Sequence, residues 1–462
     1  MIRMIIHQIW NQRRQNLWIW LELAVLSAFL WIVLDPLFTM VCLKHVPKGF
    51  DSERIYFVQP TCSSELFGGG KPLENPNFVP AMDNLLTQLQ NHPRVEAVCL
   101  GCQYQVPGGG GWNGGTYYRN PAHARLDEGK EWKDQDNYVH VQWFNIPYVT
   151  GLEKWTDMLY VLGIRDAVSG EYLHVRPDAW AQRLIYISAG MATKLYGTPN
   201  VKDSTVFTNW DDDPSLGPSP VEHGRLRKID AVYADVKSRD YETPYASLFF
   251  LQNSDDNYVN RFGVYVRLKE GADGDAFMDE VRGGVLKDCC TDPFIDFSVT
   301  SLNDLIQSAT ETVGANDTVR LQAALGFFGL LCVFLGVSGL FWVRCGERRQ
   351  DIGVMRSLGA SRRAVNRQML LEGTVLLTAA FLVAMLFVWW YVHKNGYDMG
   401  LTEQAVNWNG PDMTYWFNRP VPHILSVTAL TYVLMLVITL LGTWVPVQRA
   451  TRISPCDALR DE

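Results

Sequence analysis

The sequence predicts a membrane protein with four transmembrane α-helices and one large mixed α/β domain outside the membrane. Three stretches, 321–343, 373–392 and 424–447, carry no charged residue, and each has the length of about 20 residues that crosses a hydrocarbon core about 30 Å thick. A fourth apolar stretch, 17–34, lies near the N-terminus. The long segment 44–315 carries 25 Lys and Arg and 37 Asp and Glu residues, as expected of a domain in water.

The first stretch is the weakest of the four because it contains Glu22 and is followed by Asp35. A signal peptide is the alternative, but no A-x-A-like cleavage site follows. The apolar run continues to Leu43, so we predict an uncleaved helix over 17–43. We interpret Glu22 as a snorkelling or interfacial charge, since a carboxylate at the bilayer centre costs about 3 kcal/mol on insertion scales.

Basic residues predict the orientation of the chain. The segments 1–16, 344–367 and 448–462 together hold thirteen arginines and no lysine, whereas the connection 393–421 holds two basic residues. The positive-inside rule therefore places both termini and the 344–367 loop in the cytoplasm. The segment 44–315 then lies outside the cell membrane, and its net charge of −12 argues against nucleic acid as a partner.

The chain is thus predicted as a series of segments that alternate between membrane and water. In residues 1–16, isoleucines at near-helical spacing are flanked by arginines, which predicts an amphipathic helix in contact with membrane lipid. The predicted order is a cytoplasmic amphipathic helix 1–16, transmembrane helix 17–43, extracytoplasmic α/β domain 44–300, stalk helix 301–320, transmembrane helix 321–343, cytoplasmic loop 344–367, transmembrane helix 368–392, extracytoplasmic loop 393–421, transmembrane helix 422–447 and cytoplasmic tail 448–462.

The segment outside the membrane contains strand and helix patterns in mixture. The runs 55–58 and 262–268 are rich in β-branched and aromatic residues, as strands are. The second run is followed by a turn and a helical pattern, and 81–89 is a further short helix. Ser301-Leu302-Asn303-Asp304 has the form of a capping box. It begins either a continuous stalk helix over 301–320 or a short helix that breaks near Gly314.

Five of the nine cysteines lie in this segment. Cys99 and Cys102 have C-x-x-C spacing, which is compatible with a disulfide, a redox pair or half of a metal site. No second pair with histidines completes a zinc pattern, so a local disulfide or ordinary packing is the preferred interpretation.

Catalytic and metal-binding patterns are scarce in the sequence. There is no H-E-x-x-H and no G-x-S-x-G. The run Gly68-Gly69-Gly70-Lys71-Pro72 lacks the first glycine and the Ser or Thr of a phosphate loop. Asp211-Asp212-Asp213 is interpreted as a solvated loop. We therefore predict that the chain is not an enzyme and binds no cofactor or metal of its own.

The most informative cytoplasmic stretch is ERRQDIGVMRSLGASRR, residues 347–363. Ile352, Met355 and Leu358 are predicted to share one helical face among arginines. Gly359 is a typical helix stop and Ser361 a typical cap for the next helix. A short amphipathic helix at this position is compatible with binding the membrane surface, with retention of the loop inside the cell, or with docking to a cytoplasmic protein.

This stretch resembles the signature loop of FtsX-like permeases, the MacB and lipoprotein-releasing type of ABC transporter. The family pattern is E-R-x-x-E-I-G-x-x-R-x-L-G-A-S, with Asp351 here at a position where glutamate is usual. The ending PVQRATRISPCDALR is similar to the family's P-x-x-R-A-x-x-I-x-P-x-x-A-L-R. The segments 185–197 and 264–281 resemble parts of the family's extracytoplasmic domain, so the resemblance implies a MacB-like periplasmic core domain.

The resemblance implies partners as well as a fold. Family members are dimers, so we expect a homodimer or a heterodimer with a second permease, together with a separate ABC ATPase that carries ATP and Mg and, in some systems, a periplasmic adaptor. It also implies that one helix of the cytoplasmic loop docks into the ATPase. The residues expected to make this ATPase-coupling helix are Glu347, Arg348, Asp351, Ile352, Met355, Arg356, Leu358 and Gly359.

The expected function is that of the permease subunit of an ABC transporter in the cell (inner) membrane. ATP hydrolysis by the partner would move the extracytoplasmic domain, and that movement would export or extract a peptide, lipoprotein or drug. The alternative is a membrane sensor or regulator with an ATPase partner that controls a signalling kinase or a cell-wall hydrolase.

Overall fold

The computed structural model describes residues 13–62, 75–103, 106–109, 113–127, 130, 137–208, 225–237, 239–253, 262–312, 314–398 and 415–452. The chain divides into two compact units. The helical unit comprises Met1–Cys42, Asn316–Leu401 and Pro411–Glu462, and the α/β unit comprises Leu43–Ala315 and Thr402–Gly410. Residues 1–12 of the predicted helix over 1–16, the glycine-rich run 68–72, the acidic run 211–213 and most of the tail 448–462 lie outside the described residues.

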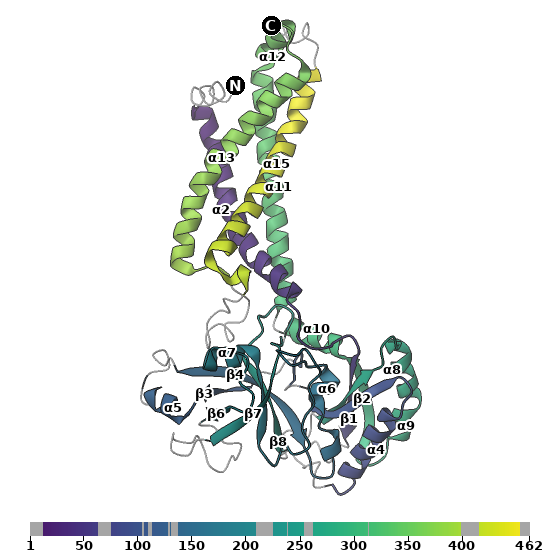
Figure 1. The fold of residues 1–462 in the computed structure, drawn as a ribbon. Coiled ribbons are helices and arrows are strands. Elements are labelled where there is room, and N and C mark those ends of the chain that lie inside the picture. The colour runs from purple at the N-terminus through teal and green to yellow at the C-terminus, as the bar shows by residue number, and fades with distance from the viewer. Residues whose placement is uncertain are drawn as a thin grey trace. The chain divides into compact units, whose positions relative to one another are not determined.

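Four long helices make up most of the helical unit (Figure 1). All four are long and apolar enough to cross a membrane, by length and composition, which confirms the predicted number of transmembrane helices. Each is longer than the apolar stretch from which it was predicted. Their bounds are α2 (Arg13–His45), α11 (Ala315–Glu347), α13 (Arg362–Asn395) and α15 (Pro420–Arg452).

Glycines on α11 allow close approach of α2. A Cβ at Gly336 would collide with the carboxylate of Glu22, and one at Gly329 would lie 3.1 Å from the ring of Phe29. Small residues at helix interfaces let membrane helices pack closely. The Glu22 side chain therefore lies against the neighbouring helix at Gly336.

The predicted stalk helix over 301–320 is wrong as a continuous helix. Helix α10 (Leu302–Thr312) ends before Gly314, and α11 begins at Ala315. Gly314 has φ +69°, in the left-handed region where glycine is favoured. The capping-box prediction is confirmed, because the Ser301 hydroxyl accepts a hydrogen bond of 3.1 Å from the Asp304 amide. The alternative of a short helix broken near Gly314 is the one that the structure adopts.

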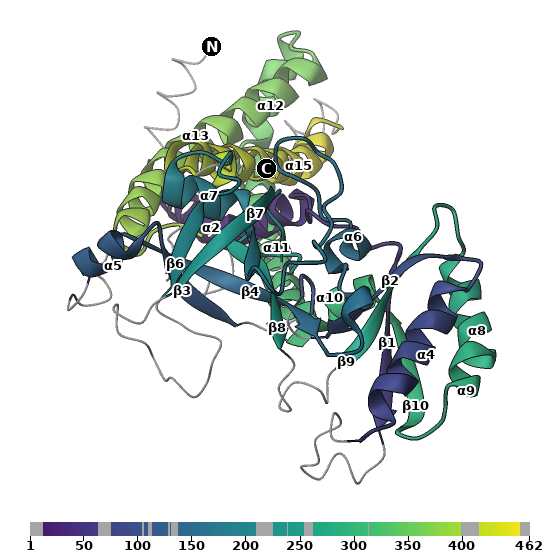
Figure 2. The same cartoon turned by 60° about the horizontal axis from the view of Figure 1, so that its bottom comes forward.

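The α/β unit contains a four-stranded antiparallel sheet in the order β10-β1-β9-β2. Three helices pack on one face of it, where alternate strand residues such as Val58, Leu100 and Val264 join a hydrophobic core with Phe277 of α8 (Figure 2). The predicted strand 262–268 and helix 81–89 are both present. The bounds are β1 (Ile55–Cys62), β2 (Val95–Cys102), β9 (Phe262–Leu268), β10 (Phe294–Ser301), α4 (Phe78–Gln90), α8 (Gly274–Gly283) and α9 (Val285–Asp288).

The remaining strands of this unit close into a six-stranded barrel in the order β3-β4-β8-β5-β7-β6. Two of its pairs, β4 with β8 and β5 with β7, are parallel. The other elements are short. The bounds are β3 (Gly114–Tyr118), β4 (Tyr138–Tyr148), β5 (Leu184–Ser188), β6 (Thr205–Thr208), β7 (Arg225–Tyr233), β8 (Ser247–Asn253), α5 (Pro121–Asp127), α6 (Met158–Leu162), α7 (Ala189–Tyr196) and the 3-10 helices η3 (Glu153–Trp155) and η7 (Trp416–Asn418), the last in the helical unit.

A shared hydrophobic core joins the sheet to the barrel. It combines Phe57 and Tyr265 from the second face of the sheet with Phe144 and Phe249 from the barrel strands, and Leu302 of α10 packs into the same core. Burial of aromatic and aliphatic area is the main stabilising contribution to such a junction. The sheet is therefore buried on both faces.

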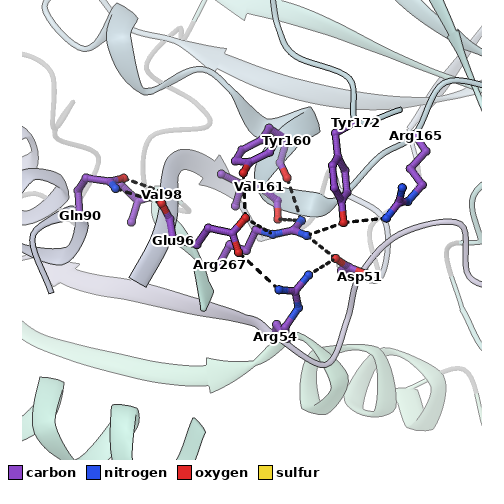
Figure 3. Close-up of polar contacts among 10 residues, drawn as sticks. All are labelled: Asp51, Arg54, Gln90, Glu96, Val98, Tyr160, Val161, Arg165, Tyr172 and Arg267. Atoms are coloured by element: carbon purple, nitrogen blue, oxygen red, sulfur yellow. Dashed lines mark hydrogen bonds and ion pairs between the residues drawn. The ribbon is translucent and has the colours of Figure 1, made fainter. Parts of the chain in front are cut away.

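Arg267 lies at this junction as the centre of a polar cluster (Figure 3). One of its terminal nitrogens is 2.6 Å from the Asp51 carboxylate, and its Nε lies 3.3 Å from Glu96, an ion-pair contact without hydrogen-bond geometry. The other terminal nitrogen donates to the Tyr160 carbonyl at 3.0 Å, and the Tyr172 ring lies 5.0 Å from the guanidinium. We call Asp51, Arg54, Glu96, Tyr160, Tyr172 and Arg267 the Arg267 cluster.

The Arg267 cluster connects segments that are distant in sequence. Arg54, beside β1, also binds Asp51 at 3.0 Å and Glu96 at 3.4 Å. The Tyr160 hydroxyl donates to Glu96 at 2.8 Å, and this contact raises the pKa of Tyr160. Two carboxylates thus face two guanidinium groups, so the buried charge of Arg267 is compensated.

Cys99 and Cys102 do not form the disulfide that their spacing suggested. Both lie on β2, and their side chains belong to different hydrophobic cores on opposite faces of the sheet. Residues three apart in a strand point to opposite sides, which keeps their sulfur atoms apart. Burial raises the pKa of Cys99 well above its usual value. The C-x-x-C spacing is therefore explained by ordinary packing in a buried strand.

Candidate coupling site

The loop between the second and third long helices folds into a separate short helix, α12 (Arg349–Ser357). Helix α12 is followed by Gly359 at φ +97°, which confirms the predicted stop. The Ser361 hydroxyl accepts a hydrogen bond of 3.2 Å from the Ala364 amide and caps α13, as predicted. Both ends of the loop are therefore fixed by local sequence.

The apolar side chains of α12 and of Leu358, which directly follows it, divide into two groups. Ile352 is 3% exposed and packs with Cys345, Val365, Met369 and Val447, and Met355 packs against the same core. Val354 and Leu358, in contrast, are 44% and 82% exposed. The predicted single face of Ile352, Met355 and Leu358 is wrong, because the helix ends at Ser357 and Leu358 follows in the turn.

A buried charged cluster holds the beginning of α12. Arg344 of α11 lies 2.9 Å from one carboxylate oxygen of Glu372 on α13, and Arg348 lies 2.8 Å from the other. All three side chains are at most 10% exposed. We call these residues the Glu372 cluster. Glu372 contacts both arginines, and these contacts help to offset the cost of burying charge.

The other end of α12 is held by Arg356. Its guanidinium donates a hydrogen bond of 3.0 Å to the carbonyl oxygen of Thr451, in the last turn of α15. A cation at this position also interacts favourably with the helix dipole. Helix α12 is thus connected to α13 through Arg348, the residue before its start, and to α15 near its last residue.

These contacts would allow a displacement of α12 to be transferred to the long helices. A force on α12 would act on three long helices through Arg348, Ile352 and Arg356, while Val354 and Leu358 remain exposed for another surface. Exposed aliphatic side chains beside arginines are typical of a docking surface. No group of three or more metal-binding side chains occurs among the described residues.

The predicted coupling residues have different positions in this site. Arg348, Ile352, Met355 and Arg356 face the chain's own helices, and Glu347, Leu358 and Gly359 are exposed. Asp351 lies in α12, and its side chain is outside the described set.

Sequence reasoning missed Arg344 and Glu372. The signal was present, since Glu372 directly precedes the uncharged stretch 373–392 and Arg344 directly follows 321–343. Opposite charges at adjacent ends of two antiparallel membrane helices are candidates for a pair.

A second buried polar contact joins α2 to the beginning of α15, far from α12. The fully buried His423 of α15 lies 2.5 Å from a carboxylate oxygen of Asp35 on α2, and its other ring nitrogen lies 2.7 Å from the Phe417 carbonyl. The second Asp35 oxygen accepts from the Asp398 amide at 2.9 Å. Asp35, one of the two acidic residues that weakened the prediction of the first helix, therefore has partners within the helical unit.

Known proteins with similar sequences support a family assignment. The model of the FtsX-like permease C-terminal domain matches residues 323–455, which include α12, the Glu372 cluster and most of α11, α13 and α15.

Two curated relatives are macrolide export ATP-binding/permease proteins named MacB. The one from Chlorobium luteolum is 23% identical over 286 residues, which are 61% of this chain and 38% of the relative. The one from Rhodopirellula baltica is 21% identical over 274 residues, 59% of this chain and 37% of the relative. The chain thus spans less than two fifths of the length of these relatives.

A solved structure is also similar. The periplasmic region of MacB from Actinobacillus actinomycetemcomitans aligns with 58% of this chain and 97% of its own, at 9% identity and a TM-score of 0.28. Because that score is low, the assignment rests on the family model and the two relatives. Residues 323–455 thus match the FtsX-like permease C-terminal domain, and the chain is similar to MacB-type ABC transporter permeases over 59–61% of its length.

Proposed function

We propose that this chain is the membrane subunit of an ABC transporter in which a separate ATPase docks on α12 and moves the helices to which α12 is attached. The observation that carries the proposal is the division of α12, with Ile352 packed inward and Leu358 exposed. One side chain holds the helix to its own unit, and the other is available to a partner.

We propose that ATP is bound outside these 462 residues, in which no G-x-x-x-x-G-K-[ST] phosphate loop occurs. The two relatives are named as ATP-binding/permease proteins, and this chain matches less than two fifths of each. ATP and Mg would accordingly be bound by the partner.

Docking would be stabilised by apolar burial and guided by charge. Complete burial of an exposed leucine contributes about 2 kcal/mol, and Val354 adds a smaller amount. The exposed Arg362, which follows α12, would help to steer an acidic groove into register. The apolar contact thus supplies affinity, and the charges supply orientation.

Movement would then pass from α12 into the bundle by direct contacts. The Arg348–Glu372 ion pair connects α12 to α13, and the Arg356 hydrogen bond connects it to α15. Buried, well-packed contacts transmit displacement because they resist compression.

The positive-inside distribution of arginines supports a cytoplasmic α12 and cytoplasmic termini. The α/β unit would then lie outside the inner membrane, in the periplasm or extracellular space. With a dimer of this subunit or a second permease, and with a periplasmic adaptor where one exists, ATP-driven movement would export or extract a peptide, lipoprotein or drug.

The test is co-purification of the full chain with its ATPase, followed by measurement of ATP hydrolysis in nanodiscs. Leu358→Asp should weaken ATPase binding by about 30-fold, the equivalent of burying one leucine, and abolish stimulation by the permease. The matched control is Leu126→Asp on α5 of the α/β unit, where the leucine is 60% exposed; it should leave both quantities unchanged. If Leu358→Asp binds and stimulates the ATPase like the control, α12 is not the docking helix.

A further inference from the structure

A groove on the helical unit combines two arginines with an apolar floor. It has a volume of about 310 Å³ and lies between α13 and α15, which pack along each other (Figure 1). Its lining is Arg363, Asn366, Arg367, Leu370, Leu371, Thr374 and Leu440. All except Leu440 come from the first turns of α13, so local sequence determines most of the groove.

The polar part of this groove lies at one end. Arg363 and Arg367 are one helical turn apart, both are exposed, and no ion pair is formed by either among the described residues. The Oδ1 atom of Asn366, between them, is buried and has no hydrogen-bond partner in the described part of the chain. This end therefore offers two positive charges and one acceptor.

The other end of the groove is apolar. Leu370, Leu371 and Leu440 line it, and the Thr374 hydroxyl donates to the Leu370 carbonyl at 2.9 Å, which leaves its methyl group for the groove. From Arg363 to Thr374 the helix rises about 16 Å, close to the depth of one leaflet, about half of a 30 Å core. Charge thus lies at headgroup depth and leucines lie at acyl-chain depth.

We propose that this groove binds one anionic phospholipid of the phosphatidylglycerol type. Its phosphate would bind Arg363 and Arg367 as a charge-assisted pair, and a headgroup hydroxyl would donate to Asn366 Oδ1. One acyl chain would lie along Leu370, Leu371 and Leu440. This occupant follows from charge complementarity at one end and apolar lining at the other, and it does not depend on the proposed ATPase.

The test uses the full chain, purified in mild detergent, with bound lipid counted by native mass spectrometry. After delipidation, phosphatidylglycerol and phosphatidylcholine with the same acyl chains are added back at equal concentration. The wild-type chain should retain one phosphatidylglycerol and show no comparable phosphatidylcholine adduct. Equal retention of the two lipids would overturn the proposal.

Two sets of variants separate the groove from general surface charge. Arg363→Gln/Arg367→Gln should lower phosphatidylglycerol retention by at least about tenfold, since each basic contact to an anionic lipid contributes about 1 kcal/mol. The control Arg362→Gln/Arg449→Gln removes the same charge from exposed arginines outside the groove and should retain the lipid. Loss of lipid to the same extent in both pairs would contradict a specific site.

Two further measurements test the nature of the occupant. Leu440→Trp keeps both arginines but fills the apolar end, and it should also lower retention. Glycerol 3-phosphate, which lacks acyl chains, should not displace the lipid; displacement would indicate a simple anion site and overturn the proposal. The lipid site is also ruled out if Arg363→Gln/Arg367→Gln weakens ATPase binding and leaves lipid retention unchanged, because the arginines would then face the ATPase.

Discussion

Each unit of this protein contains a buried arginine cluster, and the two clusters are built differently. In the Arg267 cluster, two carboxylates and two carbonyl oxygens surround one buried guanidinium, with Arg54 alongside. In the Glu372 cluster, one carboxylate serves two buried arginines. Asp51 is 37% exposed in the first, whereas Glu372 is 3% exposed in the second.

The two clusters differ in how many carboxylates are seen to contact each buried arginine: Arg267 contacts two, whereas Arg344 and Arg348 both contact Glu372. Arg267 keeps a carboxylate if either acid is removed, and its acids retain access to water. Arg344 and Arg348 both lose the carboxylate of Glu372 when that one residue is changed, and their side chains are only 8% and 10% exposed. Uncompensated buried charge is among the most destabilising defects in proteins. The cluster beside α12 should therefore be the more sensitive of the two.

The largest effect is expected for Glu372→Gln. It removes the carboxylate that both buried arginines contact and should lower the free energy of unfolding of the helical unit by about 3–5 kcal/mol. Thermal unfolding of the full chain in detergent measures this loss.

The control for that variant removes the whole cluster. Arg344→Leu/Arg348→Met/Glu372→Leu replaces all three charges with apolar side chains and should recover most of the stability, since apolar replacement of a buried ion group is often neutral. A triple variant as unstable as Glu372→Gln would show that the charges themselves stabilise the bundle.

A smaller loss is expected for Arg267→Met. It removes the hydrogen bonds to Asp51 and to the Tyr160 carbonyl, but the two acids keep Arg54 and partial access to water. We expect the α/β unit to lose about 2–3 kcal/mol, the usual contribution of hydrogen bonds to a charged group. If Arg267→Met is as destabilising as Glu372→Gln under the same conditions, the proposed difference between the clusters is wrong.

Acid should destabilise the α/β unit in a manner that depends on His140. Burial lowers the pKa of His140 in β4 to about 4, from an ordinary value near 6.5. The unfolded chain therefore takes up the proton first as pH falls, so the contribution of His140 is complete above about pH 6.5 and is lost towards pH 4, with about 2 kcal/mol lost at pH 5.

The contribution of His140 is measured as the difference in unfolding free energy between the wild-type chain and one variant. Unfolding of the wild-type chain and of His140→Asn is followed from pH 7 to pH 4, so that acid effects common to both cancel. The variant should lose less stability than the wild type over this range. Parallel curves would mean that His140 is protonated in the folded state at its ordinary pKa.

Parts of this fold could be predicted because a transmembrane helix or a buried strand is specified by the composition of one continuous segment. Long uncharged stretches predicted three of the long helices, an apolar stretch around Glu22 predicted the fourth, and β-branched runs predicted β1 and β9. The stalk was not decided by sequence, because the capping box at Ser301 favoured a helix and Gly314 favoured a break. Only the structure shows that the break occurs.

The candidate site was harder to predict because it depends on contacts between segments. A helical pattern grouped Ile352 with Leu358, but the helix ends at Ser357 and the two side chains point to different surroundings. Glu372 lay beside an uncharged stretch, and its partner Arg344 is 28 positions away in sequence. Pairings of this kind require the packing of α11 against α13.

The most direct test of the account is photo-crosslinking from two positions of α12 in the full chain reconstituted with its ATPase. A photoreactive amino acid at position 358 should crosslink to the ATPase, because Leu358 is exposed. The same group at position 352 should crosslink within the chain, to α13 or α15, because Ile352 is buried among Met369 and Val447. Crosslinks to the ATPase from position 352 and none from 358 would contradict the division of α12 into an inner and a docking side.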